Sequence, residues 1–576
     1  MKHLFSQLKR YRAATILAPL FKLAEALLEL VVPLIVSRVV DDGIGGGDGT
    51  YVIRASLLLV LIGFAGLLFS VSAQYFAARA AVGSTNGLRR ELFRHATAFP
   101  FRALDEIGTP TMVTRLTGDV NQVRTGVNLG LRLLLRSPFI VFGALVMAFT
   151  VDTRSALIFA VMIPVLFAAA FAVMLTTIPL YRRSQGKLDR VTALTRENLT
   201  GVRVIRSFGR EDAENARFET ESEGLSKLNR FVGRIAGLLN PLTYVIVNLA
   251  VIVLLQTGAV EINAGTLTQG ELVALYNYLS QILVELLKLT SLIITLNRSF
   301  ASARRIGEVL DRRETLETLP EETPDHETKD EIVFRGVSLT YPGASGEALS
   351  SIDLSVGRGE NLGIIGCTGS GKSTLTGLIP HFYDATEGEV LVDGIDVRAY
   401  PTERLRKKIG IVMQESLLFS GTVRDNLKLA NPDATDAEME EALGVAQILD
   451  TVKEKGGLDA KIEQGGRNLS GGQRQRLSIA RALVRHPEIL ILDDSFSALD
   501  YETDLRLRRA IANLPKKATV LTISQRTSTL RSADRIAVLD GGRLVGLGTH
   551  EELLSSCPVY AEIDASQKAS GKEGAV

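Results

Sequence analysis

Cysteine is scarce in this sequence, with only Cys367 and Cys557 among 576 residues. Neither has a nearby partner cysteine or the spacing of metal ligands, so the sequence predicts neither a disulfide framework nor a cysteine metal site. We interpret both as small structural thiols. We also expect Cys367 to stay reduced on the cytosolic side of a membrane.

An excess of charge of one sign is also missing. Lys and Arg number 65 against 64 Asp and Glu, a formal net charge of +1, so no global field favours nucleic acid as a partner. A cleavable signal peptide is missing too. The basic residues Lys2, Lys9 and Arg10 precede an apolar stretch that is too long for a signal and lacks a small-residue cleavage site. We expect a retained first membrane span behind a short amphipathic helix.

Long apolar runs are abundant, however. Hydrophobic residues make up 46% of a chain that is too long for one core, so two or more domains are expected. A helix needs about 20 residues to cross a bilayer. Six stretches meet that length, and they lie at residues 14–39, 54–81, 131–151, 155–180, 237–260 and 270–298.

The basic residues between these stretches predict their orientation. The loops around Asp41–Gly45 and Glu261–Gly265 contain no Lys or Arg, whereas the connections spanning Arg89–Arg124 and Arg182–Arg210 are strongly basic. Basic loops stay on the cytoplasmic side. Both termini and both long connections are therefore predicted to be cytoplasmic, in a multi-pass protein of the cell membrane.

The two basic connections resemble membrane helices that extend far into the cytoplasm. Each has a punctuated tip where a short coupling helix would fit, near Gly108–Thr111 and near Ser207–Glu211. A solvated charged hairpin would show the same pattern, and the two readings carry similar weight.

Three charges lie on one face of the first span, because Lys22, Glu25 and Glu29 are separated by three and four residues. Charges within a span usually face the bundle interior or a wet cavity. A substrate-cavity role and a plain Lys22–Glu25 ion pair with snorkelling are weighed evenly. Polar residues of the last span could line a cavity or serve helix packing: Tyr276, Tyr278 and Gln281.

The pattern changes after the charged, proline-containing segment 312–331, which reads as a linker between a membrane domain (1–311) and a second domain (332–567). Short β-rich runs then alternate with helical stretches, which predicts an α/β fold. The last residues, 568–576, are polar, and we expect a disordered tail. The predicted strands include Ile332–Phe334, Leu362–Ile365, Gly388–Val392, Ile409–Met413, Ile489–Leu492, Thr519–Ile523 and Ile536–Leu539.

The second domain contains a phosphate-binding loop of the form G-x-x-x-x-G-K-[ST] between an apolar strand and a helix. Its residues are Gly366, Cys367, Thr368, Gly369, Ser370, Gly371, Lys372, Ser373 and Thr374. The backbone N–H groups and the helix N-terminus favour phosphate oxygens. Lys372 supplies a charge to the terminal phosphates, and the Ser373 hydroxyl can bind Mg²⁺.

Two further motifs of the second domain occur at spacings that suit a phosphate-binding site. The buried run ending in Asp493 and Asp494 places two acids at a strand end, where Asp493 would bind Mg²⁺ and the next acid would polarise the attacking water. A serine–glycine turn opens a helix and can contact a terminal phosphate, although an ordinary helix N-cap is the default reading. Its residues are Ser470, Gly471, Gly472 and Gln473.

Together these motifs resemble the ATP-binding cassette (ABC) exporters, specifically a bacterial multidrug-type half-transporter. The resemblance covers essentially the whole chain. It implies a six-helix membrane bundle fused to a P-loop ATPase domain, with ATP and Mg²⁺ as ligands. It also implies that Tyr341 stacks on adenine and that Gln414 touches Mg²⁺. The segment Glu463–Gly466 occupies the place of the family's cross-linking loop, and Ser497–Asp500 that of its D-loop.

The chain departs from the family at two positions. Asp494 stands where the family has its catalytic glutamate, and Gln525 stands where it has a switch histidine. Aspartate is shorter by one methylene, and a displacement of about 1 Å can lower a rate 10²-fold. A glutamine amide can hydrogen-bond the γ-phosphate but cannot become a cation.

These departures resemble the degenerate half of a heterodimeric exporter. In that family two chains bind two ATP molecules between them, so Ser470–Gln473 would complete the site of a second half-transporter. The partner is then predicted to carry Glu and His at the positions of Asp494 and Gln525. A homodimeric exporter or a lipid or peptide flippase with slow, symmetric hydrolysis is the alternative, and an ATP-gated regulatory or channel protein is a third. The substrate class stays open among hydrophobic small molecules, lipids and peptides.

Overall fold

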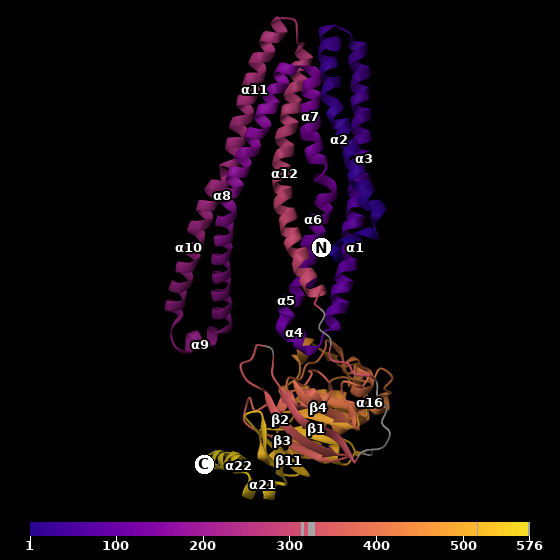
Figure 1. The fold of residues 1–576 in the computed structure, drawn as a ribbon, viewed down its shortest axis with the longest axis vertical. Helices are drawn as coiled ribbons and strands as arrows, with labels where there is room; N and C mark the ends of the chain where they lie inside the picture. The colour runs from indigo at the N-terminus through magenta and orange to yellow at the C-terminus, as the bar shows by residue number, and fades with distance from the viewer. Residues whose placement is uncertain (313–315, 321–328, 342, 515–516, 574–576) are drawn as a thin grey trace. The chain divides into compact units, whose positions relative to one another are not determined.

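The computed structural model describes residues 1–312, 316–320, 329–341, 343–514 and 517–573. The chain divides into two compact units, Met1–Ala98 with Gly108–Arg313 and Phe99–Ile107 with Glu314–Val576. Most of the expected linker, 312–331, lies outside the described residues. Figure 1 traces both units in chain order.

Unit 1 is entirely helical. Its helices are α1 (Lys2–Lys9), α2 (Arg12–Arg38), α3 (Gly49–Thr97), α5 (Thr109–Thr114), α6 (Val120–Leu133), α7 (Arg136–Val151), α8 (Thr153–Thr200), α9 (Val202–Ser207), α10 (Glu211–Gly237), α11 (Leu239–Asn263) and α12 (Gln269–Leu310), with π-helical turns at Val39–Gly45 and Arg115–Asp119. The helices α3, α8 and α12 run on well past the length that a bilayer needs, as the basic connections predict.

Polar caps determine where three of the long helices start. The Asp48 carboxylate accepts hydrogen bonds from the N–H groups at the start of α3, Asp152 caps α8, and Thr268 forms a capping box with Glu271 at α12. Such caps satisfy N–H groups that have no partner within the helix.

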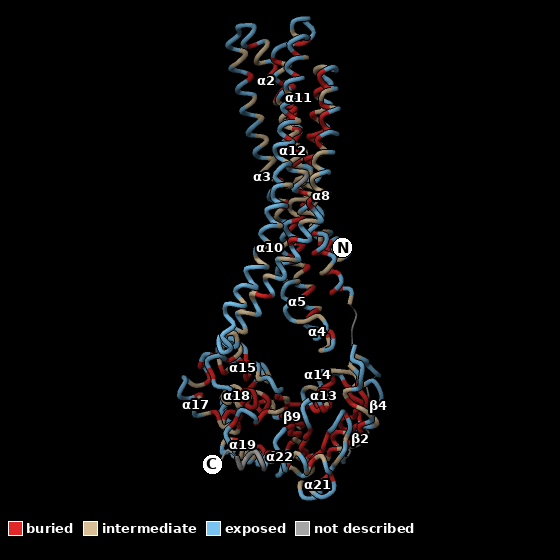
Figure 2. Tube along the Cα trace, turned by 90° about the vertical axis from the view of Figure 1, so that its left-hand side faces the viewer, coloured by how far each residue is buried: buried red, intermediate tan, exposed pale blue. Residues whose placement is uncertain are grey.

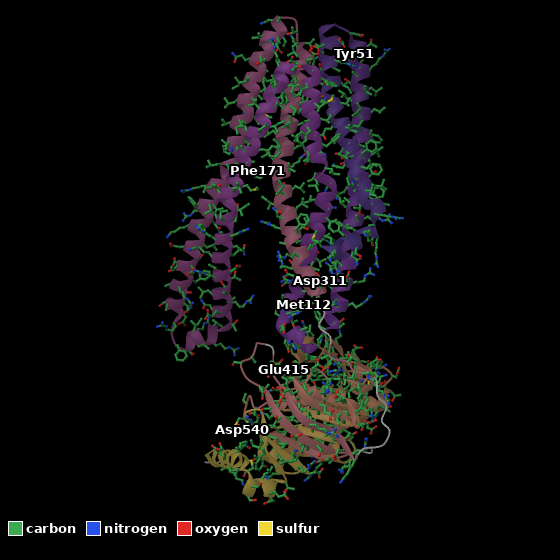
Figure 3. All side chains as sticks on the ribbon, in the orientation of Figure 1. Tyr51, Met112, Phe171, Asp311, Glu415 and Asp540 are labelled. Atoms are coloured by element: carbon green, nitrogen blue, oxygen red, sulfur yellow. The ribbon has the colours of Figure 1, made fainter. Side chains whose placement is uncertain are left out.

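Five helical segments are long and apolar enough to cross a membrane: Gly49–Thr97, Thr109–Val151, Thr153–Thr200, Glu211–Asn263 and Gln269–Leu310. They contain five of the six expected spans. Apolar side chains lie exposed along α3, α8 and α11, among them Phe171, labelled in Figure 3. Such continuous apolar surface is typical of helices that lipid surrounds. The remaining span, in α2, is not among the five, because every 18-residue stretch of α2 contains Lys22, Glu25 and Glu29.

The three charged side chains of α2 form ion pairs. The Lys22 ammonium lies 2.5 Å from the Glu25 carboxylate, which is the simple pair that the sequence allowed. Glu29 pairs instead with Arg136 of α7 at 2.6 Å, and Arg136 pairs with Glu285 of α12 at 2.5 Å. The side chains of Arg136 and Glu285 are buried, so this network joins three helices inside the bundle. Sequence reasoning missed both residues.

The three polar residues of the last span differ in their surroundings. Tyr278 is fully buried and donates a hydrogen bond from its hydroxyl to the Leu30 carbonyl at 2.7 Å, which is a packing role. Tyr276 is 47% exposed. The Gln281 Oε1 atom is buried without a hydrogen-bond partner among the described residues.

Unit 2 is an α/β domain. Its strands are β1 (Asp330–Leu339), β2 (Leu349–Gly357), β3 (Asn361–Ile365), β4 (Glu387–Val392), β5 (Ile395–Asp396), β6 (Ile409–Val412), β7 (Gly421–Thr422), β8 (Lys461–Ile462), β9 (Ile489–Asp493), β10 (Thr519–Ile523), β11 (Arg535–Asp540) and β12 (Arg543–Gly548). All seven predicted strands are present, whereas the two long strands β2 and β12 and the two-residue strands β5, β7 and β8 were missed.

Helices accompany these strands. They are α4 (Phe101–Ile107), α13 (Lys372–Leu378), α14 (Thr402–Lys408), α15 (Val423–Lys428), α16 (Asp436–Val445), α17 (Leu449–Glu454), α18 (Gly471–Leu483), α19 (Tyr501–Ala512), α20 (Thr527–Leu530), α21 (His550–Ser556) and α22 (Pro558–Glu573), with 3₁₀ turns at Gly457–Asp459 and Gln464–Gly466. The disordered tail expected from Lys568 is therefore wrong over residues 568–573, which continue α22. A Lys568–Asp564 ion pair at 2.5 Å, one turn apart, supports this last turn.

Two main sheets build the domain. One has the order β2-β1-β4-β5, and the other has the order β12-β11-β3-β10-β9-β6. In the second sheet β11, β3, β10, β9 and β6 are parallel, so their carboxyl ends meet at one edge. Figure 2 shows the chain buried around β9. The near-continuous apolar sequence of these strands follows from burial on both faces.

Short helices lie at or beside both expected coupling segments: α5 begins at Thr109 within the first, and α9 ends at Ser207, where the second begins. Helix α4 ends at Ile107, before the expected segment, because Gly108 adopts a left-handed φ of 76°. Within unit 2, α4 packs its Phe101 ring 4.4 Å from the ring of Phe382, and Asp105 accepts a hydrogen bond from the Tyr383 hydroxyl at 2.8 Å. Helix α9 ends at Ser207 and has no buried residue.

Candidate functional site

The phosphate-binding loop joins β3 to α13. Gly371 has a left-handed φ of 94°, and a Cβ atom there would lie 2.6 Å from the Ala348 carbonyl oxygen, so this position requires glycine. The Lys372 ammonium donates to the carbonyls of Gly366 and Cys367 at 2.8 and 2.7 Å. Burial lowers the pKa of Lys372. This loop therefore presents N–H groups and a partly desolvated cation at one end of the parallel sheet.

The two acids follow β9 at the same edge of the sheet. Asp493 is 9% exposed, and its carboxylate and the Ser373 hydroxyl line the same cavity. Burial raises the pKa of Asp493, and the neighbouring charge of Asp494 raises it further. Burial also raises the pKa of Asp494. These shifts make both carboxyl groups harder to ionise, and a cation bound beside them would act in the opposite direction.

Backbone hydrogen bonds fix the position of Asp494. Its φ is 46°, a left-handed value that is uncommon for residues other than glycine. The Asp494 N–H donates to the Ile523 carbonyl at 3.1 Å, and the Asp494 carbonyl accepts from the Gln475 amide at 3.0 Å. Gln475 belongs to α18, so the helix that begins with the serine–glycine turn also holds the acid. Sequence reasoning did not identify Gln475.

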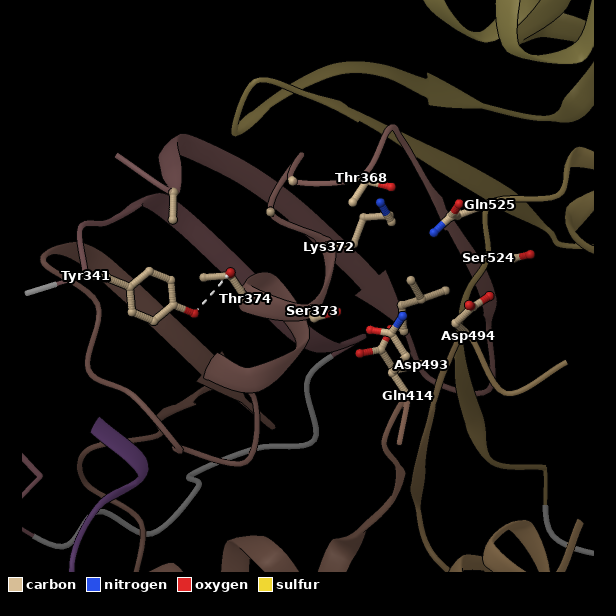
Figure 4. Close-up of a pocket in the computed structure, with 14 residues that line it drawn as sticks. Tyr341, Thr368, Lys372, Ser373, Thr374, Gln414, Asp493, Asp494, Ser524 and Gln525 are labelled. Atoms are coloured by element: carbon tan, nitrogen blue, oxygen red, sulfur yellow. Dashed lines mark hydrogen bonds between the residues drawn. The ribbon is translucent and has the colours of Figure 1, made fainter. Parts of the chain in front are cut away.

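A cavity of about 340 Å³ brings most of the predicted site residues together. Figure 4 shows Tyr341 at one end and Asp494 and Gln525 at the other. The Tyr341 hydroxyl and the Thr374 hydroxyl share a hydrogen bond at 3.1 Å. The lining residues are Tyr341, Ala348, Thr368, Gly369, Gly371, Lys372, Ser373, Thr374, Gln414, Asp493, Asp494, Ile523, Ser524 and Gln525. Sequence reasoning missed Ala348, Ile523 and Ser524, although the last two follow directly from the strand that leads to Gln525.

Some predicted site residues lie elsewhere. Gly366, Cys367 and Ser370 belong to the loop but do not line the cavity. The turn Ser470–Gln473 is also absent from the lining. It forms a capping box at the start of α18, in which Ser470 accepts from the Gln473 N–H at 3.3 Å. The N-cap reading is therefore confirmed.

The residues present fit a nucleoside triphosphate with Mg²⁺. The Ser373 hydroxyl, the Asp493 carboxylate and the Gln414 amide line one cavity and offer the oxygen ligands that Mg²⁺ prefers. A Cβ atom built on Gly369 would meet nothing within 4 Å, so open space lies beside the loop backbone. An aromatic ring at the far end can stack on a base.

Comparisons with known proteins agree with this geometry. The model of the ABC transporter transmembrane region matches residues 15–286, and the ABC transporter model matches residues 349–497. An uncharacterized ABC transporter ATP-binding protein of Mycobacterium tuberculosis is 38% identical over 99% of this chain and 98% of its own length. The ATP-dependent lipid A-core flippase of Yersinia pestis is 30% identical over 98% of this chain and 97% of its own.

The chain also resembles a solved structure. The chain is similar to a bacterial Atm1-family ABC exporter with ATP bound, with a TM-score of 0.79 and 26% identity. The match covers 97% of this chain and 98% of the other.

Proposed function

Because the chain belongs to the ABC exporters, multi-pass membrane transporters that hydrolyse ATP, we propose that it is one subunit of a heterodimeric exporter in the cell membrane. Its substrates would be hydrophobic or amphipathic molecules that leave the cytoplasm or the inner leaflet. ATP binding would close the ATPase domains of the two subunits, and the coupling helices would pass this movement to the spans.

The pairing of Asp494 and Gln525 in one cavity with an intact phosphate-binding loop carries the proposal. The Asp494 backbone is held at both its N–H and its carbonyl, so the shorter side chain has no means of moving closer to an attacking water. General bases typically contribute 10²–10⁴-fold to a rate. Gln525 keeps hydrogen bonding to a phosphate but supplies no positive charge. This site would bind Mg-ATP and hydrolyse it slowly.

Within this chain's own site, each residue would have one task. Lys372 and the loop N–H groups would bind the β- and γ-phosphates, and Tyr341 would orient the base. Ser373, Gln414 and Asp493 would hold Mg²⁺, which neutralises phosphate charge when bound. Asp494 would orient the attacking water.

The turn Ser470–Gln473 would act on the partner's nucleotide. Its sequence is intact, and it lies outside the cavity of its own chain. Because it opens a 13-residue helix, its N–H groups point at an anion approaching along the helix axis. Faster hydrolysis is therefore expected at the site that pairs this turn with the partner's phosphate-binding loop.

A second surface also supports a two-chain assembly. A groove of about 350 Å³ in unit 2 contains three buried polar atoms without hydrogen-bond partners among the described residues: Ser416 Oγ, Ser478 Oγ and Arg481 Nη1. Exposed Leu417 and Phe419 also line it. The α9 tip of a second half-transporter would pack apolar side chains against Leu417 and Phe419 and would cover this groove.

A homodimer is the alternative. One chain contains both the phosphate-binding loop and the serine–glycine turn, so two copies could complete two equal, slow sites. The relationship to a lipid A-core flippase is compatible with a lipid substrate in either assembly.

The deciding experiment compares this chain, purified alone in lipid nanodiscs, with the chain co-expressed with the half-transporter of its adjacent reading frame. We expect ATP-driven transport only from the pair. Robust ATPase activity and transport by the single chain would overturn the heterodimer and favour the homodimer. A partner sequence with Asp and Gln at both positions would contradict the degenerate-site assignment.

A further inference from the structure

The C-terminal helix α22 contacts the loop that carries Gln525. The Gln567 side-chain amide donates a hydrogen bond to the Gln525 carbonyl at 2.6 Å. Its oxygen accepts one from the Thr527 N–H at 3.0 Å. One turn earlier on the same helix, Asp564 accepts a hydrogen bond from the Thr527 hydroxyl at 2.8 Å. The Thr527 hydroxyl also lies 3.2 Å from the Gln567 oxygen, so four hydrogen bonds join α22 to residues 525–527.

The chemistry of this contact requires an amide. The Gln525 carbonyl needs a donor and the Thr527 N–H needs an acceptor, and a primary amide provides both. A carboxylate in the place of Gln567 would offer acceptors only and would repel the Gln525 carbonyl. Because β10 ends at Ile523, no neighbouring strand pairs with the backbone at these positions. The Gln567 amide takes over the role that a strand partner would have.

The contact between α22 and Thr527 is buried. Asp564 and Thr527 are 2% and 3% exposed, so their hydrogen bond is shielded from water. Leu530 of α20 and Tyr560 of α22 are fully buried in one hydrophobic cluster. Displacing α22 from this position would leave polar groups buried without partners, which is unfavourable.

The loop held in this way lines the nucleotide cavity on its other side. Ser524 and Gln525 are both lining residues. On that side the Ser524 N–H donates to the Ile364 carbonyl of the neighbouring strand at 3.1 Å. The Gln525 side chain makes no hydrogen bond to any residue that the structure describes, whereas its backbone carbonyl accepts one from Gln567. The direction in which Gln525 points into the cavity thus depends on α22.

We propose that Gln567 is a positioning residue of the ATP site, through which α22 sets the reach of Gln525 toward the terminal phosphate. This inference rests on the proposed function, because it takes Gln525 as a γ-phosphate ligand. It predicts that Gln567 matters for recognising the third phosphate and not for binding the nucleotide as a whole.

The test measures how far the full-length chain in nanodiscs prefers the non-hydrolysable ATP analogue AMP-PNP over ADP, with Mg²⁺ present. One hydrogen bond is typically equivalent to about a fivefold change in an equilibrium constant. We expect Gln567→Ala and Gln567→Glu each to lower the preference about fivefold, with unchanged ADP affinity. The matched control is Glu562→Ala, an exposed position on the same helix, and it should leave the preference unchanged.

A double-mutant cycle with Gln525→Ala separates positioning from a general structural effect. In the Gln525→Ala background, Gln567→Ala should have no further effect on the preference. Equal losses in both backgrounds, or weaker binding of both nucleotides alike, would overturn the proposal. If Gln525→Ala lowers the preference and Gln567→Ala does not, only the role of Gln567 fails. If Gln525→Ala itself has no effect, the γ-phosphate role of Gln525 in the proposed function fails, and the positioning role fails with it.

Discussion

Restoring the two departures in this chain's own site should accelerate hydrolysis there. In the variant Asp494→Glu/Gln525→His, one methylene extends the carboxylate by about 1.5 Å from a fixed backbone, while the imidazole can supply a cation at the γ-phosphate. The Asp494 N–H and carbonyl are bonded at 3.1 and 3.0 Å, so the gain comes from the side chain and not from movement of the loop.

The expected gain in hydrolysis rate follows from the change in the position of the carboxylate. A misplacement of about 1 Å lowers a rate roughly 10²-fold, and each tenfold change equals about 1.4 kcal/mol of activation free energy. We expect hydrolysis at this site to rise about 10- to 100-fold. Gln525→His alone should give a smaller gain, because a γ-phosphate ligand does not replace a positioned base.

The assay is single-turnover release of phosphate from this chain's site in the assembled pair, with the partner's catalytic acid replaced by its amide. Asp540→Glu provides the matched control, since Asp540 is exposed at the end of β11 and lies outside the cavity. No gain in the double variant would refute the reasoning, because the two departures would then not limit hydrolysis.

Three further predictions address stability and coupling. Burial raises the pKa of Asp493, so the nucleotide-free domain loses stability as the pH rises from the ordinary aspartate pKa to the raised value, and the loss is complete above it. Asp493→Asn should therefore raise the nucleotide-free melting temperature near neutral pH but abolish stabilisation by Mg-ATP, and a lower melting temperature without nucleotide would contradict this. Arg136→Gln should destabilise the membrane unit by at most about 3–5 kcal/mol in thermal unfolding, because it leaves the buried Glu285 with only the half-exposed Lys288 as a cationic partner, whereas Arg136→Met/Glu285→Met should destabilise far less; equal losses would rule out the ion pair as the cause. Tyr383→Phe removes the hydrogen bond to Asp105 of α4 and should reduce substrate-stimulated ATPase activity several-fold with unchanged ATP affinity, a result that a parallel loss of ATP binding would contradict.

Local sequence was sufficient for much of this protein. Five of the six expected spans lie in helices long and apolar enough to cross a membrane, because continuous apolar runs have few alternatives in a bilayer. All seven predicted strands are present, because short runs of β-branched residues bounded by turn residues favour a strand. The phosphate-binding loop was readable because its glycines, lysine and serine act within one strand–turn–helix unit.

Contacts between distant segments could be read only from the tertiary structure. The sequence shows Lys22, Glu25 and Glu29 on one face, but only the packing of α2, α7 and α12 brings Arg136 and Glu285 to them. The edge strands β2 and β12 were missed because their pairing partners, not their own pattern, stabilise them.

For the candidate site, too, some features were predicted by the sequence and others were determined only by the tertiary structure. The sequence by itself predicted a phosphate-binding loop at Gly366–Thr374, and it shows Asp494 and Gln525 at the two positions where the family typically has a glutamate and a histidine. Only the fold decided that Asp494, Gln525 and most of the loop line one cavity, because the parallel strands β3, β9 and β10 end at one edge. It also placed Gln567, 42 residues beyond Gln525, against that loop. A side-chain amide bonded to a distant backbone leaves no periodic trace in a sequence, and its partner is defined only when the chain has folded.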